Sequence, residues 1–273
     1  GSRGIGDVYK RPGYDIRGVY PTEIDEDTAY TIGLGFGSYI REAGKTTCVV
    51  GHDNRLSSPA LYDALIQGIL STGVDIISLG LCTTPMYYYA CIKLETYSGV
   101  MVTASHNPKD DNGFKFAFDE SGNCKGQEIQ DFLAYILRGN FQKGEGKLST
   151  YSIEEEYLEL FKKSLDFGPR RVKVVIDPGN GTTSVIAKKL YEMFPIDLVV
   201  INGESDGHFP NHHPDPCVED NLSELKQKVL EVGADVGLGF DGDGDRMGLV
   251  TNSGRFLPTD YYMILVIRDI ISK

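Results

Sequence analysis

The chain alternates short apolar runs with longer stretches of helical periodicity. Runs of four to eight apolar residues are typical of buried strands, and the first series of predicted strands is 47–53, 74–79, 98–103 and 113–118. In the last run phenylalanines recur at every second position from Phe114, as on one face of a strand. Residues 58–72 predict a helix, with Ser58 as N-cap, Pro59 in the first turn and Gly73 as C-cap.

The alternation restarts after a polar, glycine-rich stretch at 139–146, where we place a boundary. The second series of predicted elements is helix 152–165, strand 171–177, helix 182–194, strand 197–202, helix 221–232, strands 234–240 and 247–251, and an apolar helix 259–271. Such alternation favours parallel strands with helices on both faces. The sequence therefore predicts two similar α/β domains with mixed, mostly parallel sheets sandwiched by helices. The last helix has no partner units after it, so the chain looks cut short.

Composition excludes several classes of protein. The chain has 273 residues, 41% hydrophobic, and a net charge of −12 without a basic stripe, which argues against nucleic-acid binding. No apolar run is long enough to span a membrane, and no secretory signal is present. The five cysteines form no Cys-x-x-Cys pair, so we expect reduced, mostly buried thiols in a cytoplasmic protein. Gly1-Ser2 looks like a remnant of cloning, and the sequence gives no oligomeric state.

The first motif that could carry chemistry is Thr-Ala-Ser-His-Asn-Pro at 103–108. It follows a predicted strand, where loops of α/β sheets bind ligands, and an exposed Ser105 there could attack or carry a group. A plain turn serine that caps the backbone is the alternative. A serine hydrolase is disfavoured because the Gly-x-Ser-x-Gly elbow is absent. His106 is adjacent in sequence and should point away from Ser105, which disfavours a direct dyad.

The second motif is Asp-Gly-Asp-Gly-Asp-Arg at 241–246. Three carboxylates separated by glycines suit a loop that wraps one hard cation with oxygen ligands. A solvated acidic turn is the plain alternative. An EF-hand loop would need glycine at Arg246 and glutamate at Asn252. A phosphatase of the haloacid dehalogenase type would carry Thr or Val at Asp245. Arg246 beside the acidic residues fits a site that also binds phosphate.

Other polar residues lie in loops or near strands. Arg17 within 14–18 and Lys115 within 112–115 are each either a solvated surface charge or a phosphate ligand. His212 and His213 invite a metal interpretation, but three prolines stiffen their loop and adjacent histidines rarely bind one ion. We expect that loop to be structural.

These motifs together resemble the α-D-phosphohexomutases, in particular the phosphomannomutase/phosphoglucomutase type. The segment 103–108 is similar to the family's phosphoserine loop and 241–246 to its metal loop, while 14–18, 112–115 and 211–216 match further motifs in the family's order. The resemblance implies domain I at 1–147, domain II at 148–253 and the first helix of domain III at 254–273. The remainder of domain III and domain IV have no counterpart here, so this chain alone is expected to lack full activity.

The resemblance also implies an activity: interconversion of hexose 1-phosphate and hexose 6-phosphate, of mannose or glucose, through a phosphoserine at Ser105. It implies Mg²⁺ held by Asp241, Asp243, Asp245 and the Ser105 phosphate, and hexose 1,6-bisphosphate as intermediate and activator. Arg17, Lys115 and Arg246 are then catalytic and phosphate-binding, and Tyr14 and His106 contact substrate or orient the loop. A non-catalytic half-molecule that binds metal and sugar phosphate is the alternative.

Overall fold

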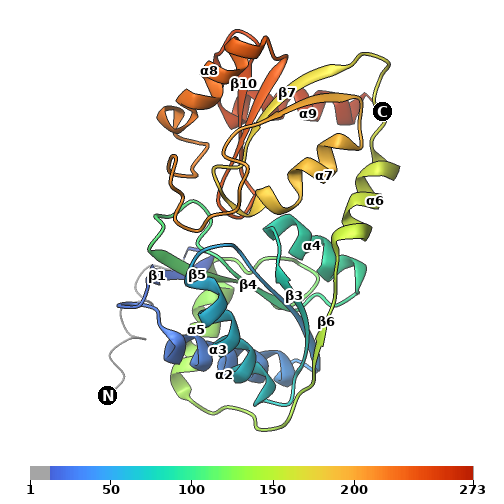
Figure 1. Ribbon diagram of the computed structural model, residues 1–273. Coiled ribbons are helices and arrows are strands. Elements are labelled where there is room, and N and C mark those ends of the chain that lie inside the picture. Colours follow the sequence, from blue (N-terminus) through green and yellow to red (C-terminus); the bar gives the residue numbers. More distant parts are fainter. Residues whose placement is uncertain (1–12, 273) are drawn as a thin grey trace. The chain divides into compact units, whose positions relative to one another are not determined.

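The computed structural model describes residues 13–272, so Gly1 and Ser2 lie outside the described residues (Figure 1). The chain divides into two compact units after Ile153. Each unit has its own sheet and its own hydrophobic core. The expected fold class, two α/β domains with mixed sheets and helices, is confirmed, whereas the domain limits at 147 and 253 stay predictions.

The first unit is built on a six-stranded mixed sheet with the order β1-β5-β4-β2-β3-β6. Its strands are β1 (Asp15–Val19), β2 (Thr47–His52), β3 (Asp75–Leu81), β4 (Gly99–Val102), β5 (Asp111–Ala117) and β6 (Leu148–Thr150). β2 is parallel to β3 and β4, β6 is parallel to β3, and β5 is antiparallel to β4 and β1. The short β6 therefore attaches the glycine-rich stretch before it to the first unit.

Helices cover both faces of this sheet (Figure 1). They are α2 (Glu26–Glu42), α3 (Ser58–Leu70), α4 (Thr84–Lys93) and α5 (Gly126–Arg138). The main core joins α2, α3 and α5 to alternate strand residues such as Val50 and Phe116, while α4 packs on the other side. Helices α2 and α3 approach closely because Gly33 lies against the Leu65 carbonyl oxygen, which would be 2.4 Å from an added Cβ.

The second unit has a five-stranded sheet with the order β11-β10-β9-β7-β8. Its strands are β7 (Val172–Asp177), β8 (Ile196–Val200), β9 (Val236–Phe240), β10 (Met247–Thr251) and β11 (Phe256–Leu257). Its helices are α6 (Glu154–Ser164), α7 (Ala187–Glu192), α8 (Ser223–Val232) and α9 (Thr259–Ile271), with 3-10 turns η1 (Thr182–Val185) and η2 (Glu219–Leu222). Val175 packs in the core with α8, and its neighbours Val174 and Ile176 pack in the core with α7. The strand is thus buried on both faces.

Several predicted helix limits are wrong. The helix expected at 182–194 breaks at Ile186 (φ −124°, ψ −27°) into η1 and α7, and the Thr182 amide at its start donates to the Gly242 carbonyl instead. Ser57, not Ser58, occupies the N-cap of α3 and makes no side-chain capping bond, while the Ser58 hydroxyl donates to Asp53. Helices α2, α4 and α5 had no predicted counterpart.

The final helix α9 has the predicted limits and remains largely exposed. Tyr262 is its one buried side chain among the described residues, and the Tyr262 hydroxyl donates to the Met247 carbonyl at 2.7 Å. Isoleucines such as Ile270 and Ile271 lie in solvent, 66% and 78% exposed. Within residues 13–272, no helix is both long and apolar enough to cross a membrane. Four of the five cysteines are buried and all are free thiols, as expected.

Candidate functional site

In the first unit, the loop after β4 presents Ser105 in a strained conformation. Ser105 has φ +53°, a left-handed value that costs free energy for any residue with a side chain. Its amide donates to Thr103 Oγ1 at 2.9 Å, and the Asn107 amide donates to the Ala104 carbonyl at 2.9 Å. Ser105 is 1% exposed, whereas we expected an exposed residue, because the loop folds back on itself and its carbonyls turn inward.

A residue that the sequence analysis missed holds this loop in place. Arg55, on the segment between β2 and α3, is 1% exposed and forms an ion pair with the buried Asp53, Nε to Oδ2 3.3 Å. Its guanidinium donates to four backbone carbonyls, those of Ser105, Asn107, Pro108 and Asp111, at 2.6–3.0 Å. A buried cation with this many acceptors fixes the loop's path. The sequence does contain a signal for this contact: Asp53 and Arg55 are oppositely charged and directly follow a buried strand.

The structure brings Arg17 to the same loop. Arg17 Nη1 donates to Asn107 Oδ1 at 2.8 Å and to the Ala104 carbonyl at 3.3 Å, while its Nε donates to Asp15 at 2.8 Å. Its guanidinium is therefore a loop contact and not simply a solvated surface charge. It is partly exposed, 22% at the side chain, so part of it is accessible to a ligand.

Lys115 lies on the same face of the sheet as Arg17. On β5 it pairs with Asp15 of β1 and with Met101 of β4, and it is 6% exposed. Its neighbours Phe114 and Phe116 point into the main core, so the period-2 geometry of a strand turns Lys115 to the opposite face. A lysine that is this buried is not a solvated surface charge, which was one of the two alternatives for Lys115.

The structure shows fewer contacts to the Ser105 loop for the other two predicted substrate ligands of the first unit, Tyr14 and His106. Tyr14 is 68% exposed, and its carbonyl accepts a hydrogen bond from the Cys124 thiol at 3.4 Å. His106 is half-buried within the Ser105 loop. Their assignment to substrate binding stays a prediction.

In the second unit, the acidic loop joins the antiparallel strands β9 and β10. Asp241, Asp243 and Asp245 each offer a carboxylate oxygen within 4.8 Å of the others, and the first two are buried while Asp245 is exposed. Asp241 Oδ1 accepts hydrogen bonds from the amides of Gly244 at 3.1 Å and Arg246 at 3.0 Å. Gly244 has φ +80°, which only glycine adopts without strain, so the turn depends on it.

This donor set fits a hard divalent cation. Mg²⁺ and Ca²⁺ prefer carboxylate oxygens, and a buried cluster of like charges is costly unless a cation or a proton neutralises it. Among residues 13–272, no other group of three or more acidic, histidine or cysteine residues has this geometry. The predicted triad is thus brought together, and Arg246 follows it directly on the chain with an exposed side chain.

Hydrogen bonds of His212 hold the histidine loop within the second unit, and the structural role of this loop stays a prediction. His212 Nε2 donates to Asp177 Oδ2 at 2.7 Å and its Nδ1 donates to the His213 carbonyl at 2.9 Å, an arrangement that needs a proton on both nitrogens. Burial alone would lower the pKa of His212, but the hydrogen bond and attraction of Asp177 outweigh it and raise that pKa above 6.5. The imidazolium fastens the loop to the end of β7.

Family models match both units. The model of phosphoglucomutase/phosphomannomutase α/β/α domain I matches residues 10–143, and the model of domain II from the same enzymes matches residues 155–254. The chain belongs to the α-D-phosphohexomutase family. The two matches come in domain order and together cover most of the chain, in agreement with the resemblance of the sequence motifs.

Relatives agree with this assignment. This phosphohexomutase chain is 41% identical over 260 residues to a phosphomannomutase/phosphoglucomutase of Pseudomonas syringae pv. tomato. The match covers 95% of this chain and 56% of that protein. It is 35% identical over 269 residues to a phosphoglucomutase of Neisseria gonorrhoeae, covering 98% and 58%. The chain therefore spans somewhat more than half the length of the relatives it matches.

A solved structure is also similar. A phosphoglucomutase/phosphomannomutase family protein from Burkholderia thailandensis matches with a TM-score of 0.90 and 36% identity, covering 95% of this chain and 58% of that one.

Proposed function

We propose that the protein containing this chain is a phosphohexomutase that interconverts hexose 1-phosphate and hexose 6-phosphate. The carrying observation is the acidic loop, where three carboxylate oxygens within 4.8 Å form a hard-cation site in a chain of this family. The braced loop of Ser105 is the second element that the reaction needs. The similarity to a phosphomannomutase/phosphoglucomutase and to a phosphoglucomutase favours mannose and glucose phosphates as substrates.

In this proposal Ser105 carries the phosphoryl group. A sugar hydroxyl oxygen forms a bond to phosphorus while the bond from Ser105 Oγ to phosphorus breaks, and the hydroxyl proton passes to a base, for which the neutral amine of Lys115 is the candidate, whereas Arg17 stays a guanidinium cation that binds phosphate. The product is hexose 1,6-bisphosphate. Its other phosphoryl group then returns to Ser105, so the same bisphosphate also serves as activator by phosphorylating an unmodified serine.

Asp241, Asp243 and Asp245 would hold Mg²⁺ together with an oxygen of the Ser105 phosphate. When bound, Mg²⁺ supplies charge neutralisation to the transferring phosphoryl group. The chain's own cations, Arg17, Lys115 and Arg246, add positive charge, and Arg55 keeps the Ser105 loop rigid through its four carbonyl contacts. Phosphoryl transfer depends mainly on positioning and charge, which these residues are suited to supply.

Two alternatives are distinguishable by experiment. A non-catalytic half-molecule that binds metal and sugar phosphate is favoured by the chain's coverage of 56% of a relative. A Mg²⁺-dependent phosphatase would release inorganic phosphate and leave no stable phosphoserine. For this chain by itself we propose low or absent turnover, because it spans only 56% and 58% of the length of the two mutases it matches.

The test combines mass and activity. Intact-mass measurement before and after phosphatase treatment should show a loss of roughly 80 Da, one phosphoryl group, that maps to Ser105. In the full-length protein, Ser105→Ala should abolish mutase turnover, whereas the exposed Ser164→Ala should leave it unchanged. Full turnover by Ser105→Ala would remove the carrier role. Full activity of the 273-residue chain by itself would overturn the proposal that its turnover is low or absent.

A further inference from the structure

Two loops leave the same edge of the sheet in the second unit. β7 and β9 are parallel neighbours, and Asp177 at the end of β7 pairs with Gly239 near the end of β9. Because the carboxyl ends of parallel neighbours meet at one edge, the loop after β7, residues 178–182, lies beside the acidic loop 241–245. The proposed mutase reaction uses only the acidic loop and leaves the β7 loop without a role.

The two loops are in backbone contact. The Thr182 amide donates to the Gly242 carbonyl at 2.9 Å. A Cβ added to Gly181 would lie 3.1 Å from both the Cα atom and the carbonyl oxygen of Gly242, so the backbone would have to shift to admit it. Thr182 is 0% exposed, as are Asp241 and Asp243, which flank Gly242. The contact is therefore shielded from water, where a hydrogen bond is electrostatically stronger.

This contact acts on the peptide group that joins Gly242 to Asp243. Asp241 is held within the acidic loop, since its Oδ1 accepts the amides of Gly244 and Arg246. The Gly242 carbonyl carbon is bonded to the nitrogen of Asp243, and the planar peptide group keeps that carbonyl and the Asp243 Cα in one plane. A bond that fixes the direction of the Gly242 carbonyl therefore limits the movement of Asp243 relative to Asp241.

The β7 loop is itself held in place from its other side. Asp177 Oδ1 accepts hydrogen bonds from the Gly179 amide at 2.9 Å and from Asn202 Nδ2 at 3.1 Å. The Asn180 amide donates to the Asn202 carbonyl at 2.9 Å, and Asn180 Oδ1 accepts from Asn211 Nδ2 at 2.9 Å. Because these contacts already order the loop, its bond to the acidic loop requires little further loss of backbone entropy.

We propose that Thr182 and Gly181 are positioning residues of the cation site. The Thr182 amide sets the orientation of the Gly242 peptide group, and the absent side chain of Gly181 lets the two loops approach closely enough for that bond. This inference rests on the proposed function and deepens it, because the cation concerned is the Mg²⁺ proposed for the acidic loop. Groups that orient metal ligands without touching the ion change its affinity about 10- to 100-fold when they are removed.

Two substitutions at one position isolate the amide. Thr182→Pro removes the N–H and places a ring carbon against the Gly242 carbonyl, whereas Thr182→Val keeps the N–H and replaces only the hydroxyl by a methyl group. Proline suits this position, because Thr182 is the first residue of η1 and Gly181 before it is extended, with φ −80° and ψ −172°. Neither substitution alters the net charge of −12, which attracts cations unspecifically.

Cation affinity of the 273-residue chain is measured with Mn²⁺ by electron paramagnetic resonance, and with Mg²⁺ and Ca²⁺ by displacement of Mn²⁺. Thr182→Pro should weaken Mn²⁺ and Mg²⁺ binding about tenfold or more, and Thr182→Val less than about twofold. Mg²⁺ should lose more affinity than Ca²⁺, because Mg²⁺ needs a site of fixed geometry and Ca²⁺ tolerates a flexible one. A general loss of stability would lower the melting temperature without changing this preference.

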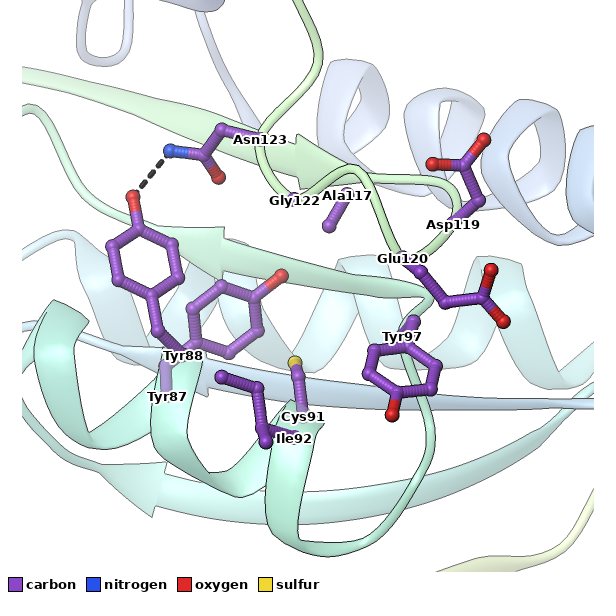
Figure 2. Close-up of a pocket in the computed structure, with 10 residues that line it drawn as sticks. All are labelled: Tyr87, Tyr88, Cys91, Ile92, Tyr97, Ala117, Asp119, Glu120, Gly122 and Asn123. Carbon is purple, nitrogen blue, oxygen red and sulfur yellow. Dashed lines mark hydrogen bonds between the residues drawn. The ribbon is translucent and has the colours of Figure 1, made fainter.

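Gly181→Ala is a milder second variant. Its Cβ would press on the Gly242 backbone and should weaken Mn²⁺ roughly three- to tenfold, whereas Gly168→Ala in the same unit, with nothing within 4 Å, should not. Cation binding outside the acidic loop is checked with Glu120→Gln. Glu120 and Asp119 are adjacent exposed carboxylates beside a cavity of the first unit (Figure 2), and this substitution should leave Mn²⁺ affinity unchanged.

The outcomes separate this inference from the proposed function. Equal Mn²⁺ affinity of Thr182→Pro and Thr182→Val, with binding lost in Asp243→Asn, would overturn the positioning role and leave the cation site standing. No saturable Mn²⁺ binding by the unchanged chain, or binding that Asp243→Asn does not weaken, would overturn the cation site and the positioning role together. If Thr182→Pro does not fold, Gly181→Ala decides, and an affinity equal to that of Gly168→Ala would overturn the positioning role.

Discussion

The strongest structural prediction concerns Arg55, whose replacement by methionine should selectively destabilise the first unit. Methionine keeps much of the apolar stem but removes the guanidinium. It would leave the buried Asp53 without its cationic partner at 3.3 Å. It would also remove the donor of four backbone carbonyls, those of Ser105, Asn107, Pro108 and Asp111.

The expected loss of unfolding free energy in Arg55→Met follows from the burial of the Arg55–Asp53 pair. Both partners of the Arg55–Asp53 pair have 0% side-chain exposure, and removing one partner of a buried pair costs about 3–5 kcal/mol. Four hydrogen bonds to a charged donor, at roughly 1.5–3 kcal/mol each, would add up to more. That sum overestimates the loss, because contacts within one network are not additive and water reaches the carbonyls once the loop loosens. We therefore expect about 3–5 kcal/mol, a large fraction of the ~5–15 kcal/mol of a typical domain.

Hydrogen exchange by mass spectrometry in increasing urea measures this loss in each unit separately. In Arg55→Met, peptides covering 99–117 should lose protection at lower urea, while peptides of the second unit serve as internal reference. Arg41→Met is the matched control: Arg41 is exposed and donates to the carbonyls of Thr72 at 2.7 Å and Lys143 at 3.2 Å, so it should cost about 1 kcal/mol or less. Unchanged protection of 99–117 in Arg55→Met would refute the bracing role.

Three further predictions address other parts of the chain. Because the folded pKa of His212 is raised above 6.5, its stabilisation of the second unit is complete below the unfolded pKa and is lost as pH rises through the folded pKa; His212→Gln should therefore lower the urea midpoint at acidic pH and have least effect at alkaline pH. Mg²⁺ at a hundredfold excess over its Kd should stabilise the second unit by about 2.7 kcal/mol in calorimetry, and Asp243→Asn should abolish most of this gain. Gly33→Ala places a Cβ 2.4 Å from the Leu65 carbonyl oxygen and should cost about 1–3 kcal/mol by denaturant titration, whereas Gly126→Ala, with nothing within 4 Å, should change stability by less than about 0.5 kcal/mol.

The buried strands were predictable because their signal is local. The runs that became β2, β7 and β10 are short and bounded by turn residues, and β10 has its predicted limits. Helix α2 escaped prediction because its glycines at 33, 35 and 37 argue against a helix. These glycines let neighbouring elements pack closely against α2, because added Cβ atoms at these positions would lie 2.2–2.4 Å from Leu65, Ile136 and Thr72. Close packing outweighs the propensity cost.

The two candidate motifs also differ in how far apart their contacting residues lie along the chain. The acidic loop was recognisable because its three carboxylates lie within five residues and only the hairpin between β9 and β10 is needed to gather them. The bracing of Ser105 was not recognisable, since Arg55 is 50 residues away from Ser105 and reaches it only through the parallel pairing of β2 and β4. A periodicity argument carries no information about such a contact.

The Ser105 loop departs from local backbone preference in a way that suits the carrier role proposed for Ser105. At φ +53° glycine would remove the backbone strain of about 1–2 kcal/mol, yet glycine has no hydroxyl to carry a group. The strain is sustained because Arg55 binds the carbonyls on both sides of the turn, at Ser105 and at Asn107, and Arg17 holds the Asn107 side chain. Two arginines from separate strands or loops thus overdetermine a backbone shape that the local sequence would not adopt. Strain that persists under such bracing fixes the direction of the serine side chain, which is the condition a phosphoryl carrier has to meet.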